Sequence, residues 1–281
     1  ANFLNLMKNG DGSNNIISVI SGLGWGLGYF GMPHILVRFM AVRDEKEMTK
    51  SKATAISWVA LSLGFAVFIG TLGRAYLPEL VNGNNEKVFI EMIKKVFTVE
   101  MRAPFIAGLF LCGILAAIMS TADSQLLVSA SSVAEDIFKG LLKKDADDKT
   151  VMNVSRVTVL VVAVLAYIIA WNPNNTVMGL VSNAWAGLGA AFGPLVVMSL
   201  YWKRTNFPGA VAGIVTGALA VIIWDYIPLV GGQTLGKATG LYSLVVGFGL
   251  GLIAIIAVSL ATKAPSEEML QEFEDVKANR L

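Results

Sequence analysis

The stretch Cys112–Asp136, CGILAAIMSTADSQLLVSASSVAED, is an apolar run interrupted near its middle by a cluster of polar side chains. On a helix, four of its residues fall at i, i+3, i+4 and i+7 and share one stripe: Ala117, Ser120, Thr121 and Ser124. At membrane depth such a stripe is either an oxygen-lined site for a small hard cation or a polar seam, in which hydroxyls bond to carbonyls four residues earlier or to a neighbouring helix. Asp123 is adjacent, and an intramembrane carboxylate favours the cation site.

The composition is that of an integral membrane protein. The chain has 281 residues, of which 55% are hydrophobic and 15% charged, whereas ordinary soluble domains carry about 25% charged residues. Its mean hydropathy is +0.64. With a net charge of +2 and basic residues confined to certain loops, no nucleic-acid surface is expected. A single cysteine, Cys112, excludes an internal disulfide.

The apolar residues come in blocks of roughly 20, the length that crosses about 30 Å of hydrocarbon. Seven blocks are bounded by charges or by Pro, Gly and Asn: 14–41, 54–77, 104–138, 151–171, 176–202, 208–228 and 240–262. We therefore predict an all-α fold, with a seven-helix transmembrane region over residues 1–262 and a tail over residues 263–281.

Basic residues indicate which loops face the cytoplasm. Lysine and arginine are concentrated in loop 42–53, in the loop after the third span, and at Lys203 and Arg204. Under the positive-inside rule these loops are cytoplasmic, so the chain starts outside and its tail lies in the cytoplasm. The connection 78–103 has nearly balanced charges and apolar residues at helical spacing, which predicts an extracellular loop with a short capping helix.

The first span contains an irregular segment, Ser21–Pro33, SGLGWGLGYFGMP. Each interior glycine costs a helix about 1 kcal/mol relative to alanine, so five glycines followed by Pro33 predict a broken or unwound helix. Non-helical backbone at membrane depth is tolerated only where protein buries it or a cavity hydrates it, so this segment should line a pocket with Trp25 and Tyr29. Close packing of glycines four residues apart is the simpler alternative.

Other conspicuous residues fit structural roles. His34, the only histidine, directly follows Pro33 and fits a hydrogen-bonded residue near a kink better than a metal centre. Asn183 and Trp185 lie among small residues in SNAWAGLGAAFGP (182–194), which favours tight packing over a place on a pathway through the membrane. The sequence has no nucleophile elbow, P-loop, HExxH motif or paired carboxylates, so no enzyme is expected.

Three segments resemble the sodium:solute symporter family and, within it, the sodium/proline symporters. They are GLGWGLGYFGMPHILVRFMA (22–41), ILAAIMSTADSQLLVSASSVAEDIFKG (114–140) and SNAWAGLGAAFGP. The resemblance covers essentially the whole chain, but against the family's layout it covers only the second half. The chain also opens without an initiator Met or a targeting signal, so it is expected to be the interior of a longer product.

The resemblance implies a leucine-transporter-type fold, in which two inverted repeats of five helices hold the sites at their interface. Spans one to five would be the second repeat, and spans six and seven two appended C-terminal helices. The implied partners are a small-molecule substrate, a sodium ion, the lipid bilayer and the missing N-terminal half of the same transporter. The implied location is the plasma or inner membrane of the cell.

The resemblance also assigns site residues by motif position. Ala117 would offer its backbone carbonyl to Na⁺, and Ser120 and Thr121 their hydroxyls, with the remaining ligands on a broken helix of the missing half. Na⁺ is the co-transported ion and the only cofactor implied. Some family members have a second sodium site one turn along, where this chain has Asp123 and Ser124, although proline-type members are taken to couple one ion.

Three residues match family positions that shape the substrate pocket: Trp25, Tyr29 and Pro33. The implied function is sodium-coupled uptake of a small amino acid, namely Na⁺/L-proline symport by alternating access. The alternative is a transporter-like membrane solute sensor, in which the same helices bind a solute and signal to a cytoplasmic domain.

Overall fold

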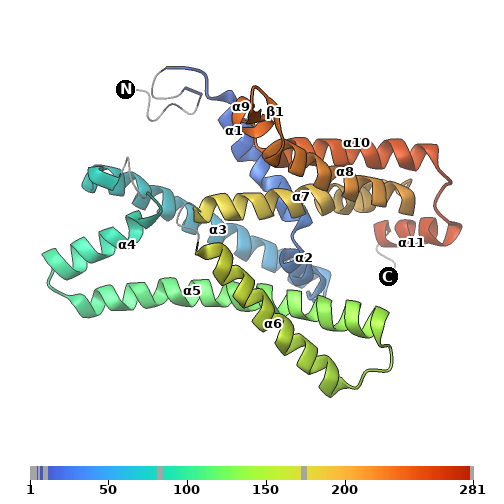
Figure 1. Ribbon diagram of the computed structural model, residues 1–281, viewed down its shortest axis with the longest axis horizontal. Helices are drawn as coiled ribbons and strands as arrows, with labels where there is room; N and C mark the ends of the chain where they lie inside the picture. The colour runs from blue at the N-terminus through green and yellow to red at the C-terminus, as the bar shows by residue number, and fades with distance from the viewer. Residues whose placement is uncertain (1–4, 6, 9–11, 81–84, 172–175, 279–281) are drawn as a thin grey trace. The chain divides into compact units, whose positions relative to one another are not determined.

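The computed structural model describes residues 5, 7–8, 12–80, 85–171 and 176–278 (Figure 1). The chain forms two compact units, Ala1–Leu36 with Met178–Leu281 (the first unit) and Val37–Val177 (the second unit). Both are built from helices, which confirms the all-α prediction at this level. The strand structure in the described residues is a two-stranded hairpin and one isolated bridge between Lys8 and Asn14, neither of which was predicted.

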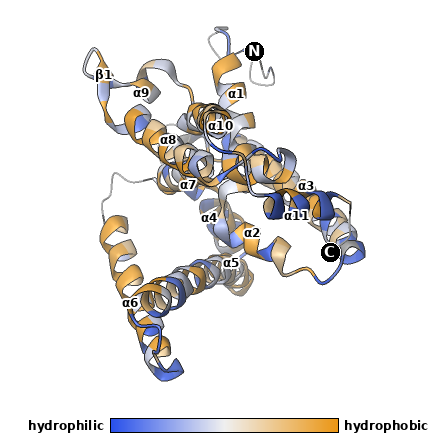
Figure 2. Cartoon of the chain, turned by 90° about the vertical axis from the view of Figure 1, so that its right-hand side faces the viewer, coloured by the Kyte–Doolittle hydropathy of each residue, from blue (hydrophilic) through white to orange (hydrophobic). Residues whose placement is uncertain are grey.

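Among the described residues, six helices are long and apolar enough to cross a membrane, and there are up to seven candidate spans if the bent pair Ile16–Gly31 and Pro33–Met40 is one span. All seven overlap the blocks expected from hydropathy. Figure 2 shows hydrophobic residues along the long helices and hydrophilic residues in α11 (Glu267–Lys277). The short helix expected in the connection 78–103 is also present, as α4 (Val88–Ile93).

The first unit begins with α1 (Ile16–Gly24), the 3₁₀ helix η1 (Trp25–Gly31) and the start of α2 (Pro33–Met40). After the second unit, the first unit resumes with these elements in order: α7 (Val177–Tyr201), α8 (Phe207–Tyr226), β1 (Pro228–Val230), β2 (Gln233–Thr234), α9 (Leu235–Thr239), α10 (Ser243–Ala261) and α11. Asn206 caps α8, because its side-chain oxygen accepts the N–H of Gly209 at 3.0 Å. The hairpin and α9 connect α8 to α10.

Close helix contact holds the first unit together. Helices α8 and α10 lie side by side (Figure 1). The contact face of α8 carries glycines four residues apart at 209, 213 and 217, the small-xxx-small pattern of membrane helix interfaces. A Cβ atom on Gly213 would lie 2.3 Å from Cγ1 of Ile255, and one on Gly217 would lie 2.0 Å from the carbonyl oxygen of Ala190 on α7. Glycine therefore lets α8 contact both α10 and α7.

In the described residues of the second unit, α3 (Glu45–Tyr76) is followed by the short helices η2 (Pro78–Leu80), η3 (Asn85–Lys87) and α4. Three longer helical segments come next. These are the π-helix η4 (Lys94–Glu100), α5 (Pro104–Ser131) with its π-helical extension η5 (Ser132–Leu142), and α6 (Asp148–Ala170). Asp44 caps α3 by accepting the N–H of Glu47 at 2.8 Å. A small cluster of Ala134, Ala146 and Val151 forms where η5 turns into α6.

Candidate functional site

The first span is broken, as the glycines and Pro33 predicted. Helix α1 tightens into the 3₁₀ helix η1 at Trp25, Met32 is extended at φ −89° and ψ 111°, and α2 begins at Pro33. The two parts of the span make an angle of 55°. The carbonyl oxygen of Met32 accepts the N–H groups of Ile35 and Leu36 at 3.0 Å each, which starts the new helix. The break therefore lies after the glycine-rich part, which itself stays helical in a tighter form.

The 3₁₀ geometry of η1 determines which residues face α7. With three residues per turn, Trp25, Gly28 and Gly31 lie on one face. A Cβ atom on Gly28 would lie 2.0 Å from Nε1 of Trp185, and one on Gly31 would lie 2.6 Å from the carbonyl oxygen of Leu188. Gly28 therefore packs closely on α7, because a side chain there would separate η1 from α7. Of the glycines four residues apart, Gly24 and Gly28 fit the close-packing alternative, whereas Gly22 and Gly26 meet no atom within 4 Å.

Four aromatic residues, Trp25, Tyr29, Trp185 and Tyr242, form a cluster around η1, which we call the aromatic cluster. The ring of Trp25 stacks on Trp185 at 5.5 Å and on Tyr242 at 5.8 Å between centroids, with interplanar angles of 14° and 15°. Tyr29 meets Trp185 edge-on at 4.9 Å. Such ring pairs are each worth about 0.5–1.5 kcal/mol beyond the area they bury. The two aromatic residues predicted for the pocket are thus brought together through Trp185.

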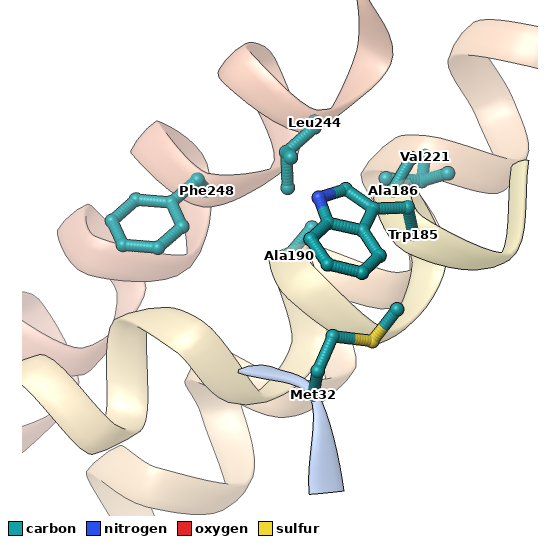
Figure 3. Close-up of a cluster of buried hydrophobic side chains, with 7 residues drawn as sticks. All are labelled: Met32, Trp185, Ala186, Ala190, Val221, Leu244 and Phe248. Atoms are coloured by element: carbon teal, nitrogen blue, oxygen red, sulfur yellow. The ribbon is translucent and has the colours of Figure 1, made fainter. Parts of the chain in front are cut away.

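Trp185 also binds the backbone of η1. Its Nε1–H donates to the carbonyl oxygen of Trp25 at 2.9 Å, and the side chain is 9% exposed. Figure 3 shows the indole ring in the buried cluster with Met32, Ala186 and Leu244. The prediction of tight packing in 182–194 is confirmed for Ala186, which is fully buried. Trp185 combines packing with contact to the pocket residues, whereas Asn183 is exposed.

Tyr242 joins the aromatic cluster from the start of α10, far along the chain. Its hydroxyl donates to the carbonyl oxygen of Ser182 at 2.7 Å, and its backbone N–H donates to Oγ of Ser21 at 3.0 Å. A tyrosine at the end of an apolar span normally indicates an interfacial anchor, so no pattern in the sequence predicted this contact.

Three further residues singled out in the sequence lie in η1 and in the first turn of α2. Pro33 is half-buried at the first position of α2, where its fixed φ suits a helix start. Tyr29 is 49% exposed, so much of its ring is free of protein contact within the chain. His34 is half-buried in the first turn of α2, next to the bend, and its structural role stays a prediction.

The residues predicted to bind sodium lie on α5, in the second unit. Ala117, Ser120 and Thr121 are all exposed on this helix. Oγ1 of Thr121 donates to the carbonyl oxygen of Ala117 at 3.2 Å, which is the back-bonding expected of an intramembrane threonine. A hydroxyl that donates one hydrogen bond keeps its lone pairs, so Oγ1 of Thr121 can still contact a cation. The cation site and the back-bonded seam are therefore compatible at Thr121.

The next turn of α5 holds Asp123 and Ser124, the residues of the predicted second sodium site. The hydroxyl of Ser124 donates to the carbonyl oxygen of Ser120 at 3.0 Å, and Asp123 is exposed. Within the described parts of the chain, no three His, Cys, Asp or Glu residues are grouped as a metal site would require.

The described residues, which are mostly helical, form six or seven candidate crossings, one of them broken beside an aromatic cluster. This is the architecture of a multi-pass membrane protein, and discontinuous spans of this kind are typical of transporters. The chain belongs to the sodium:solute symporter family, whose sequence model matches residues 3–217. The resemblance found in the sequence is thereby confirmed. The family consists of transporters rather than enzymes.

Several curated proteins are similar to most of the chain. A sodium/proline symporter of Escherichia coli is 45% identical over 271 residues, which are 94% of this chain and 51% of that protein. The osmoregulated proline transporter OpuE of Bacillus subtilis is 43% identical over 92% of this chain and 51% of its own length. The high-affinity proline transporter PutP of the same organism is 41% identical, with 93% and 53% covered. The chain thus spans about half the length of these relatives, and no solved structure matches it.

Proposed function

We propose that the chain is the second half of a sodium-coupled symporter that takes up proline across the cell membrane by alternating access. The observation that carries the proposal is the first span, which breaks at Met32 directly after a segment that holds Trp25 and Tyr29 in an aromatic cluster. Transporter sites of this type are built around discontinuous helices. Relatives at 41–45% identity that are named proline symporters or transporters support proline as the substrate.

Within this proposal the aromatic cluster forms one wall of the substrate pocket. Tyr29 presents a half-exposed ring, and it and Trp25 both contact the indole ring of Trp185, so the apolar ring of proline would find aromatic faces here. Pro33 fixes the direction in which the chain leaves the pocket. The carboxylate and ammonium groups of the substrate would be bound by groups of the other half of the transporter and by backbone freed at the break.

The sodium half-site is the stripe on α5. Ala117 offers a backbone carbonyl, and Ser120 and Thr121 offer hydroxyls. These neutral oxygens suit a transported ion, because they bind a hard cation without the strong attraction that would prevent its release. The remaining ligands would come from the broken helix of the first half. The ion is cargo in this scheme, driven by its gradient and by a membrane potential worth about 2.3 kcal/mol per charge per 100 mV.

The family architecture that we propose has two inverted repeats. Helices α1 to α7 would form the second repeat, and α8 and α10 the two appended spans. Following the basic loops, the chain would start outside, place α4 and η4 outside, and end with α11 in the cytoplasm. Na⁺ binding would favour an outward-open state and raise the affinity for proline, and joint occupancy would permit inward opening.

Uptake of labelled proline tests the proposal. The complete transporter is the full polypeptide to which we propose the chain belongs, or a fusion of the chain to the N-terminal half of the Escherichia coli relative. In membrane vesicles it should accumulate proline with external sodium and not when choline replaces sodium. Equal uptake in the two buffers would contradict sodium coupling. Saturable proline binding without any uptake would favour the solute-sensor alternative.

A further inference from the structure

Tyr242 connects three segments of the first unit at one point. It is the residue immediately before α10, a helix that lies outside the five spans proposed as a repeat. Its ring stacks on Trp25 in η1, its hydroxyl is hydrogen-bonded to Ser182 in α7, and its backbone N–H is hydrogen-bonded to Ser21 in α1. The hydroxyl of Ser21 in turn donates to the carbonyl oxygen of Gly240 at 3.5 Å. Both ends of Tyr242 are therefore fixed.

The position of Trp25 depends on these contacts. Its ring stacks on two others at once, and its carbonyl oxygen accepts the indole N–H of Trp185. Just before it, Gly24 approaches α10 so closely that a Cβ atom would lie 2.3 Å from Cγ2 of Val245. The segment that carries Trp25 is thus held between α7 and the first turn of α10.

We propose that Tyr242 is a positioning residue for the substrate site, which acts by holding the ring of Trp25 in place against Trp185. The inference rests on the proposed function, and it extends the site to a helix that the repeat architecture leaves outside. Tyr242 need not touch proline. Its effect on proline affinity would pass through Trp25, because the stacked ring is its contact with the pocket residues.

Three variants of the complete transporter measure this role. Tyr242→Ala removes the stack and leaves the carbonyl of Ser182 without its donor, so the KM for proline should rise about tenfold while the maximal rate changes much less. Tyr242→Phe keeps the ring and loses the hydroxyl, so it should restore most of the affinity, with a KM about two- to threefold above wild type. Tyr226→Ala, in the same unit and 60% exposed at the end of α8, is the control and should leave the KM unchanged.

A double-mutant cycle tests whether Tyr242 acts through Trp25. If it does, Tyr242→Ala should add little to the loss caused by Trp25→Ala, whereas independent effects would multiply. A wild-type KM in Tyr242→Ala, or multiplying effects in the cycle, would overturn the inference. If the alanine variant does not reach the membrane, Tyr242→Leu, which also removes the stacked ring, decides, and a KM equal to wild type overturns the inference. Sodium-independent uptake by the wild type would instead contradict the proposed function, so the two failures are distinguishable.

Discussion

The two units of the chain differ in how far their long helices are buried. In the most apolar 18-residue stretch of each long helix of the first unit, the share of buried residues is 39% in α7, 22% in α8 and 33% in α10. In the second unit the corresponding values for α3, α5 and α6 are 0%, 6% and 0%. Glycines that permit backbone contact complete the packing of the first unit. Within the second unit, few residues of the long helices are buried.

The difference matters most for the polar stripe on α5. Apolar faces of membrane helices are stable against lipid tails, but hydroxyls and a carboxylate at that depth are not. The first unit therefore holds its pocket residues in place by internal contacts, whereas Ser120, Thr121 and Asp123 lie on a helix that still needs a partner. We infer that the substrate side of the site is largely preassembled in this chain and that the sodium side is assembled with another segment.

The largest expected effect concerns the chain by itself. The 281-residue chain reconstituted alone should give no sodium-dependent proline uptake, because half of the sodium ligands and half of the pocket are proposed to lie elsewhere. Uptake by liposomes that contain the chain alone is compared with uptake by the complete transporter at equal protein. Transport by the chain alone would show that the second unit needs no partner and would remove the contrast between the units.

Removing the aromatic wall should have the next largest effect. Trp25→Ala deletes the ring that stacks on Trp185 and Tyr242, so proline affinity in the complete transporter should fall tenfold or more. Equilibrium binding of labelled proline measures the change. Trp171→Ala is a suitable control, because this tryptophan is 72% exposed and ends α6 in the second unit. Wild-type affinity in Trp25→Ala would exclude the aromatic cluster from the substrate site.

Substitutions at two glycines of η1 test the packing of the first unit. Gly28→Ala places a methyl group 2.0 Å from Nε1 of Trp185 and should destabilise the protein by about 1–3 kcal/mol. Gly26→Ala meets no atom within 4 Å and is the matched control, with unchanged or slightly higher stability. The thermal unfolding midpoint in detergent compares them. Equal midpoints would mean that η1 does not pack on α7 as described.

The smallest change in sodium dependence is expected for a substitution at Asp123, in the predicted second sodium site. Asp123→Asn removes the charge beside the stripe and keeps the shape of the side chain. If the transporter couples one ion through Ala117, Ser120 and Thr121, the sodium concentration for half-maximal uptake should rise no more than about threefold. A larger shift than that of Thr121→Ala would place the ion one turn further along α5, at Asp123 and Ser124.

Features that depend on local sequence were predictable. Hydropathy located the spans, and glycines with Pro33 located the break, because helix length and backbone propensity are properties of neighbouring residues. The spacing of four between Gly209, Gly213 and Gly217 was visible and could have predicted the contact face of α8. Tyr242 was not predictable, since its bond to Ser21 joins residues 221 positions apart. Trp185 was correctly assigned to packing, but its bond to Trp25, 160 positions away, was not predictable.

The most direct test of the central claim, that α5 carries half of a sodium site, is the sodium dependence of proline uptake in Thr121→Ala. Thr158→Ala is the matched control, because Oγ1 of Thr158 on α6 makes the same kind of bond, to the carbonyl oxygen of Val154 at 2.9 Å. We predict that Thr121→Ala raises the half-maximal sodium concentration about tenfold or more at unchanged protein level, and that Thr158→Ala does not. Equal sodium dependence in both variants and the wild type would contradict the claim and leave Thr121 as a back-bonded packing residue.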